Sequence, residues 1–133
     1  MRALAPPRTT TAGRVNNSSI VLRLEYGQTA FLLTGDAEAD SESEMIASGQ
    51  NLSCNVLKVG HHGSNASTSA ELLAVAHPQI AVISVNAGNG AGYPHPEMLD
   101  RLRAAGVRVY RTDRNGNITC LSDGAHIRVD TER

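Results

Sequence analysis

This chain of 133 residues has almost no lysine and almost no net charge. Twelve basic residues stand against 13 acidic ones, which leaves a formal net charge of −1, and Lys58 is the only lysine. Non-specific binding to nucleic acid or to an anionic membrane depends on an excess of Lys and Arg, so a polybasic protein of either kind is excluded. Any contact with DNA must come from a local patch or through a metal ion.

Long apolar runs and paired cysteines are also missing. The longest apolar run is Leu72 to Ala76, whereas a spanning helix needs about 18 residues or more. We therefore predict that the chain itself crosses no membrane and is soluble. Cys54 and Cys120 each stand alone in an apolar stretch, which indicates buried thiols and leaves a disulfide between them open. The motifs of Walker phosphate loops, GxGxxG dinucleotide sites and GxSxG nucleophile elbows are absent.

Strands and helices alternate along most of the sequence. Residues 1–15 contain two adjacent prolines and no periodic pattern, which predicts a loop or a disordered lead-in. Apolar patterning then predicts strands over 20–25, 29–34, 54–59, 80–85, 107–112, 117–121 and 125–129. Helices are expected over 41–48, 68–76 and 96–105. This order makes residues 16–133 a layered α/β unit with helices against a mixed sheet.

Residue types at the helix ends support these boundaries. Ser41 with Glu44, and Thr68 with Glu71, have the spacing of capping boxes at helix N-termini. Gly49 and Gly106 stand where helix C-caps favour a positive φ. The acidic residues near the first helix are read as its solvated start, favoured by the helix dipole; they are Glu38, Asp40, Glu42 and Glu44.

Chemically versatile side chains follow the predicted strands, where α/β sheets bind ligands. Asp36 comes after one strand, and is either a turn former or a carboxylate that could bridge two metal ions. His61 and His62 stand between glycines after the next strand. In an extended segment they would point to opposite sides, so that one could bind a metal while the other packs or contacts substrate. Histidine with aspartate suits zinc or manganese, and the alternative is a solvent-facing polar loop.

Two further groups are more ambiguous. His95 stands just before a predicted helix, and could either border that helix N-terminus or contact a substrate. Five arginines cluster near the C-terminal part, and form either a solvated surface or a rim that contacts phosphates; they are Arg101, Arg103, Arg108, Arg111 and Arg114.

Taken in order, several blocks of the sequence resemble the metallo-β-lactamase-fold domain of ComEC competence proteins, over about residues 16 to 122. The blocks are NNSSIVLRLEYG from Asn16, FLLTGDAE from Phe31, VLKVGHHGS from Val56, PHPEMLDRL from Pro94 and VYRTD from Val109. The resemblance implies an αβ/βα sandwich with two metals at its edge, and hydrolysis of phosphodiester bonds in DNA during uptake. It also implies a parent protein in the cytoplasmic membrane, with this domain outside the cytoplasm.

The same resemblance suggests roles for individual residues. Asp36 would be the bridging carboxylate, and His61 the metal-binding histidine, with His62 as the alternative. Lys58 and Ser64 would lie beside the substrate phosphate, with Asn17 close to the site. His95 could replace a histidine that the family commonly has where this chain has Tyr93, and Arg111 is a candidate from the phosphate-contacting rim.

One departure from the family is large. The HxHxDH ligand motif belongs to the other half of that fold, and none of the five histidines here has its spacing. We therefore expect the C-terminal half of such a domain, with a partial zinc or manganese site and weak or no activity by itself. Half a sandwich would leave one apolar face of its sheet bare. That face would pair with the remainder of the parent chain or, in a homodimer, with a second copy.

Two other functions are compatible with these residues. A hydrolase of the same fold could act on a small phosphodiester or a lactone, which the lack of a basic field favours. Alternatively, a non-catalytic α/β module would use Asp36 and His61 as ordinary loop residues.

Overall fold

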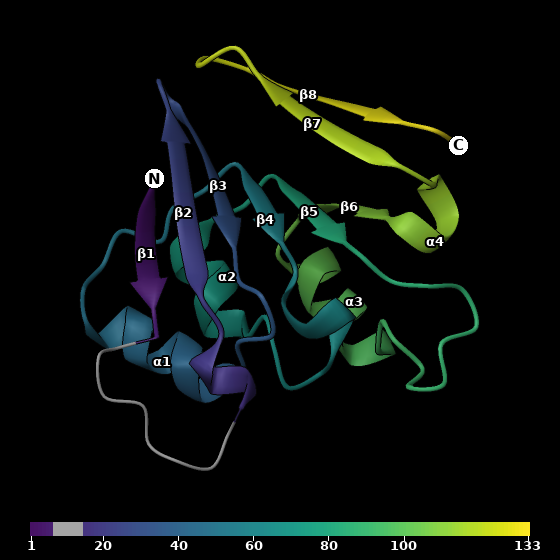
Figure 1. The fold of residues 1–133 in the computed structure, drawn as a ribbon, viewed down its shortest axis with the longest axis horizontal. Coiled ribbons are helices and arrows are strands. Elements are labelled where there is room, and N and C mark those ends of the chain that lie inside the picture. Colours follow the sequence, from purple (N-terminus) through teal and green to yellow (C-terminus); the bar gives the residue numbers. More distant parts are fainter. Residues whose placement is uncertain (7–14) are drawn as a thin grey trace.

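The computed structural model describes residues 1–6 and 15–133 (Figure 1). Six strands form one mixed sheet in the order in which they occur along the chain, namely β1 Arg2–Ala5, β2 Val21–Tyr26, β3 Thr29–Leu33, β4 Val56–Lys58, β5 Ile80–Ile83 and β6 Arg108–Arg111. A separate hairpin consists of β7 Ile118–Ser122 and β8 Ile127–Thr131. The helices are α1 Ala39–Ala47, α2 Ala70–Ala76, α3 Pro96–Ala104 and the short α4 Thr112–Asn115, with 3-10 turns η1 Asn16–Ser18 and η2 Gly60–Gly63.

The topology explains why the helices gather on one side. Strands β1, β2 and β3 pair antiparallel, whereas β3 to β6 pair parallel. Each parallel connection carries one helix, and the strands advance across the sheet in one direction. Because such crossovers are right-handed, α1, α2 and α3 fall on the same face. The predicted class, a mixed α/β sheet with helices on one face, is confirmed.

The face of the sheet under the helices holds the core. Leu32, Leu57 and Ala81 are neighbours across β3, β4 and β5, and all three are 0% exposed. They share one cluster with buried residues of the helices, among them Met45, Leu72 and Met98. This half of the fold is therefore sealed by the chain's own residues.

The next row of side chains points the other way, because successive residues of a strand alternate between faces. It consists of Leu33, Lys58, Val82 and Tyr110, which are neighbours in register and are all only half-buried. None of the four belongs to the core cluster. We call this side of the sheet the open face. It agrees with the expected apolar surface, although a lysine interrupts it.

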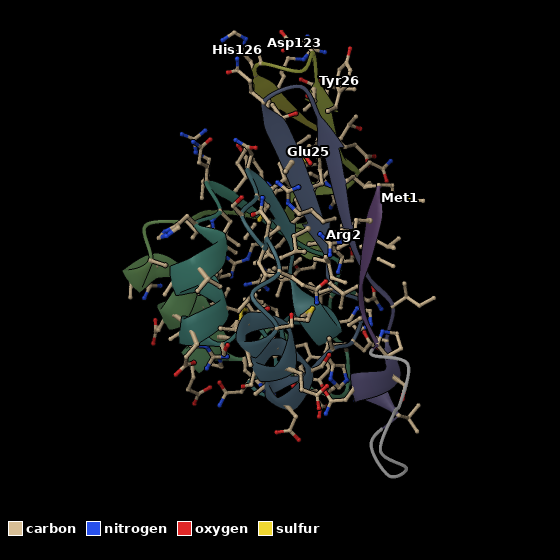
Figure 2. The ribbon with its side chains drawn as sticks, turned by 90° about the vertical axis from the view of Figure 1, so that its left-hand side faces the viewer. Met1, Arg2, Glu25, Tyr26, Asp123 and His126 are labelled. Carbon is tan, nitrogen blue, oxygen red and sulfur yellow. The ribbon has the colours of Figure 1, made fainter. Side chains whose placement is uncertain are left out.

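The hairpin covers one end of the open face. Thr29, which alternates onto this face, has its hydroxyl 2.6 Å from the hydroxyl of Ser122 in β7. The amide of Gln28 donates to the carbonyl of Gly124 in the hairpin turn. Figure 2 shows the two turns meeting at one tip, where Tyr26 lies near Asp123. The row that contains Lys58 lies at the opposite end, where β3, β4 and β5 finish.

The N-terminal prediction needs correction. Residues 1–15 were expected to form a loop or a disordered segment, but Arg2–Ala5 form β1 and pair antiparallel with β2. Leu4 and Ala5 are buried in the core, and their burial holds this short strand at the edge of the sheet. A strand of four residues is too short to show periodicity. The rest of the predicted lead-in lies, for residues 7–14, outside the described residues.

The first predicted capping box is wrong. Helix α1 begins at Ala39, before Ser41, and Glu38 is its N-cap residue without a capping side-chain hydrogen bond. Instead, Asn17 of η1 accepts hydrogen bonds from the amides of Glu38 and Ser41, at 3.0 and 3.4 Å. A side chain from another element thus replaces the local cap, which the sequence pattern could not show.

The second predicted capping box is displaced by one residue. Ser69 is the N-cap of α2, and its hydroxyl accepts from the amide of Leu72. Thr68 accepts a hydrogen bond from the amide of Gly60 instead, and so ties η2 to the start of α2. The predicted C-terminal glycines are confirmed, because Gly49 and Gly106 have φ angles of 68° and 70°.

Both cysteines are free thiols, and the alternative of a disulfide is wrong. Cys54 is buried as predicted, whereas Cys120 is only half-buried. Burial raises the pKa of Cys54 to about 12, and it also raises the pKa of the half-buried Cys120. Among residues 1–6 and 15–133, no helix is long and apolar enough to cross a membrane.

Candidate metal site and substrate groove

Three neighbouring strands end at the site. Asp36 follows β3, the two histidines follow β4, and Ser84 follows β5. Because these strands are parallel, their carboxyl ends lie at one edge of the sheet. The amide of His61 donates to the carbonyl of Gly35 at 3.0 Å, which joins the first two strand ends directly.

The two histidines lie in a tight turn rather than in extended chain. His61 and His62 have φ angles of 46° and 55°, so the expected alternation of an extended segment is wrong. Gly63 has a φ of 90°, and a Cβ there would lie 2.5 Å from the Cβ of Pro94. The turn is therefore pressed against the loop that leads into α3, and this close approach requires glycine.

His62 and Asp36 point their acceptor atoms toward the same space. The Nδ1 of His62 lies 2.7 Å from the carbonyl oxygen of Ser84. A carbonyl oxygen only accepts, so Nδ1 carries the hydrogen and Nε2 of the neutral ring keeps its lone pair. That Nε2 lies 4.0 Å from Asp36 Oδ1. A tautomer fixed by a carbonyl is the arrangement typical of a metal-binding histidine, so His62 rather than His61 has the geometry of a ligand.

His61 is oriented by a different acid. Its Nδ1 lies 3.5 Å from Glu38 Oε1 and also 3.5 Å from the side-chain nitrogen of Asn16. Asn16 in turn donates to the same Glu38 oxygen at 2.9 Å. Neither partner was predicted, because Glu38 was assigned to a solvated helix start and Asn16 was given no role. The sequence signal for Glu38 was its position two residues after Asp36, in the same block that follows a predicted strand.

Lys58 is a cation beside Asp36. It lies in the row at the strand ends, and its ammonium donates to the carbonyl of Val59 at 3.0 Å. Burial lowers the pKa of Lys58, and the negative charge of Asp36 acts in the opposite direction. Lys58 and Asp36 are therefore close enough to interact, whereas the expected contact of Lys58 with a substrate phosphate stays a prediction.

His95 is held on the other side of η2. Its backbone amide donates to the carbonyl of Gly63 at 2.9 Å, and its Nδ1 accepts from the amide of Asn65 at 3.0 Å. The neutral ring therefore carries its hydrogen on Nε2, where it can donate to an anion. His95 is also the N-cap residue of α3, which confirms its expected place at that helix N-terminus. Its contact with a substrate stays a prediction.

Two predicted substrate contacts have other partners. Ser64 is buried, and its hydroxyl accepts from the amide of Ala66 at 3.3 Å. The side chain of Asn17 caps α1, as described above. Neither group is presented as an open donor at the strand ends.

Arg111 is also occupied. Its guanidinium donates to both carboxylate oxygens of Asp113, at 3.0 and 2.6 Å. These hydrogen bonds hold the pKa of the Asp113 carboxyl below its usual value. Arg111 lies in a separate groove with Leu99 and Arg114, and does not line the groove that contains His62.

Glu42 corrects the expectation of a solvated acidic helix start. It is 0% exposed, and its two oxygens accept from the amides of Thr68 and Ser69 at 2.6 and 2.9 Å. The carboxylate thus satisfies donors at the start of α2 from inside α1. It holds in place the loop that connects η2 to α2, and with it the position of the histidines.

A groove of about 700 Å³ opens beside His62. Its lining includes Ser84, Asn86, Asn89, Tyr93 and Thr112. The loop between β5 and α3 supplies most of these groups, and the start of α4 closes the far side. The candidate ligand pair therefore has a cavity of substrate size next to it.

Asp36 and His62 fit two ligands of one divalent metal by their chemistry, since carboxylate and imidazole suit zinc or manganese. In the part of the chain that the structure describes, no group of three or more His, Cys, Asp or Glu could hold a metal ion. A metal site that includes Asp36 and His62 therefore stays a prediction, and the described residues supply no third ligand of these types beside them.

Comparison with known proteins finds matches to competence proteins. The chain is 44% identical over 103 residues to ComE operon protein 3 of Bacillus subtilis (strain 168), a match that covers 77% of this chain and 13% of that protein. It is 39% identical over 102 residues to Competence protein ComA of Neisseria gonorrhoeae, covering 76% and 15%. It is 38% identical over 103 residues to Recombination protein 2 of Haemophilus influenzae, covering 77% and 13%. The chain thus spans a small part of these relatives, and it matches no protein-family model.

Proposed function

Because the chain belongs by its sequence to the ComEC family of competence proteins, we propose that it is half of a metal-dependent hydrolase that cleaves DNA phosphodiester bonds during DNA uptake. This chain would be the C-terminal half of the hydrolase domain, which would have a metallo-β-lactamase fold. The observation that carries the proposal is the pair of acceptors formed by Asp36 and His62. The Ser84 carbonyl fixes the His62 tautomer at 2.7 Å, and the lone pair of Nε2 is directed into the space shared with Asp36.

The residues of this chain have distinct tasks in that reaction. Asp36 and His62 would hold divalent zinc or manganese, in a site that has two metals in the whole domain. A bound divalent metal lowers the pKa of a water molecule and stabilises charge on phosphoryl oxygens. Lys58 would attract the phosphate from the open face, while His95 would donate from Nε2 to a phosphate oxygen. Glu38 and Asn16 would keep His61 in position beside the ligand pair.

The remaining ligands would come from outside this chain. The site lies at the edge of the open face, at the end that the hairpin leaves uncovered. A segment of the parent chain that packed on this face would bury the row formed by Leu33, Lys58, Val82 and Tyr110. The same segment would bring the remaining metal ligands next to Asp36. A second copy of the chain is the alternative occupant of the same face. In the parent, the domain would lie outside the cytoplasmic membrane.

The test is a calorimetric titration of this chain with Mn²⁺ and with Zn²⁺. We expect binding by the unmodified chain, and at least a tenfold loss in Asp36→Ala and in His62→Ala. His61→Ala is the matched control from the same turn, and should retain most of the affinity. Equal affinity in all four proteins would contradict the assignment of Asp36 and His62 as ligands.

Hydrolysis is tested in the parent protein, where the rest of the domain is present. Asp36→Asn should abolish metal-dependent cleavage of labelled DNA, because an amide is a weaker metal ligand than a carboxylate. Asp113→Asn, which changes a carboxylate outside the site, is the matched control. Unchanged cleavage in the Asp36 variant would refute the proposed activity.

A further inference from the structure

We infer that Tyr93 stacks on a nucleobase of the substrate, so that the groove beside His62 selects single-stranded DNA over duplex. This inference rests on the proposed function, since it names the form of DNA that the site would bind. It depends on what lines the groove, on how Tyr93 is held and on where Tyr93 lies relative to the candidate ligands.

The groove suits a base better than a phosphate. Asn86, Asn89 and Asn117 line it with amide side chains. The amide of Asn89 already bonds to the backbone of Asn86 and Tyr93, so a base would use the amides of Asn86 and Asn117. Amides both donate and accept, as the edges of bases do. The charged residues of the lining are Glu132 and Arg133. A site for phosphates would instead present several cationic groups.

Tyr93 is held in place before any ligand arrives. Asn89 accepts from the amide of Tyr93 and donates to its carbonyl, in both cases at 2.8 Å. The ring packs edge-on against the rings of His61 and His95, at centroid distances of 5.6 and 5.0 Å. Such a preorganised aromatic ring loses little conformational freedom on binding, which favours its use as a stacking platform.

The position of Tyr93 connects the base to the reaction. Tyr93 and His62 line the same groove, and His61 contacts both rings. A nucleotide whose base stacks on Tyr93 would therefore direct its phosphate toward His62 and Asp36. In duplex DNA the faces of the bases are stacked on one another, so this contact requires an unpaired base.

The experiment compares three fluorescein-labelled probes bound to this chain, with EDTA present to prevent hydrolysis. They are a short oligothymidylate, an abasic oligomer of the same length, and the corresponding duplex. The abasic oligomer keeps the phosphodiester backbone and lacks the bases. Fluorescence anisotropy should show that the oligothymidylate binds about fivefold more tightly than either other probe, which is the lower end of the effect of one base–aromatic stack.

Three variants assign this preference to the ring. Tyr93→Leu should remove the preference, Tyr93→Phe should keep it, and Tyr26→Leu at the exposed tip should leave it unchanged. In the unmodified chain, the NMR signals of the Tyr93 ring and of the Asn89 side-chain amide should shift on titration with thymidine monophosphate. This measurement does not depend on how the Leu variant folds.

Other results would overturn the inference. Equal binding of oligothymidylate and abasic oligomer would show that only the backbone is recognised, and would leave the proposed DNA function intact. Duplex binding as tight as single-strand binding would refute the selection of single strands. Failure of all three probes to bind would overturn this inference alone, because the proposed function is tested separately, by DNA cleavage in the parent protein.

Discussion

The two faces of the central sheet differ in whether this chain completes them. On the helix side, Leu57 is 0% exposed and lies in a core to which all three long helices contribute. On the open face, Leu33 and Val82 are only half-buried, and Lys58 stands between them in the same row. The complete side can stabilise the fold by itself. The incomplete side borders the candidate site, so stability and activity depend on different halves of the molecule.

The sharpest test of this difference is one substitution made on each face. Leu57→Ala should lower the free energy of unfolding by about 3 kcal/mol, because a sealed core keeps the resulting cavity. Leu33→Ala removes the same atoms from the open face and should cost about 1 kcal/mol, because its side chain still touches solvent. Urea unfolding of both variants measures the difference. Similar losses at the two positions would mean that the open face is covered in solution.

The next effect concerns the buried carboxylate that joins the helices. Glu42→Gln should lower the free energy of unfolding by about 2 kcal/mol, because the amide cannot accept from both Thr68 and Ser69. Glu44→Gln, at an exposed position of the same helix, should change it by less than about 0.5 kcal/mol. Thermal unfolding of the two variants is the measurement. A harmless change at Glu42 would show that the loop before α2 does not need this carboxylate.

Leu57 and Glu42 also show what the sequence could predict. The apolar alternation of β2, and the more continuous apolar runs of β3, β4 and β5, revealed the sheet and so the helix-side core that contains Leu57. Glu42 was misread as solvated because helix position and charge give no information on what a side chain meets in three dimensions. Strand β1 was missed for a related reason, since Ala3, Leu4 and Ala5 form an apolar run of only three residues and the burial of Leu4 and Ala5 depends on the finished core.

The site was predictable only in outline. The position of Asp36 and the two histidines at one edge of the sheet was predictable, because parallel strands bring their carboxyl ends together there. Their role in metal binding stays a prediction. The choice of His62 over His61 depends on the carbonyl of Ser84, which belongs to another strand. Glu38 became a partner of His61 only because the turn at η2 has a positive φ. Contacts of this kind join separate elements, so the local sequence indicates at most that Glu38 stands near Asp36 and does not identify its partner.

A third prediction concerns what covers the open face when the rest of a parent chain is absent. We expect this chain to self-associate through the row that contains Val82, because exposed apolar surface favours a partner. Val82→Lys should weaken that association by at least about tenfold, or 1.4 kcal/mol. Val75→Lys, at an apolar residue exposed on the helix side, is the control and should have no effect. Sedimentation velocity over a concentration series measures both, and a strictly monomeric unmodified chain would contradict self-association.

The smallest expected effect is at the junction between the sheet and the hairpin that shields part of the open face. Arg111 donates to both oxygens of Asp113, and the pKa of this carboxyl is lowered in the folded protein. A group with a lowered folded-state pKa contributes stability above its unfolded pKa, near 3.9, and loses it as the pH falls through the folded value. Asp113→Asn should therefore reduce stability by about 1 kcal/mol near neutral pH and by progressively less below about pH 4. Asp130→Asn in β8, whose pair with Arg128 is exposed, is the control and should show a smaller effect. Urea unfolding across this pH range is the measurement. A loss of stability in Asp113→Asn that did not depend on pH would contradict a role for the ion pair. The junction would then be held by packing, and the hairpin would shield the open face without this pair.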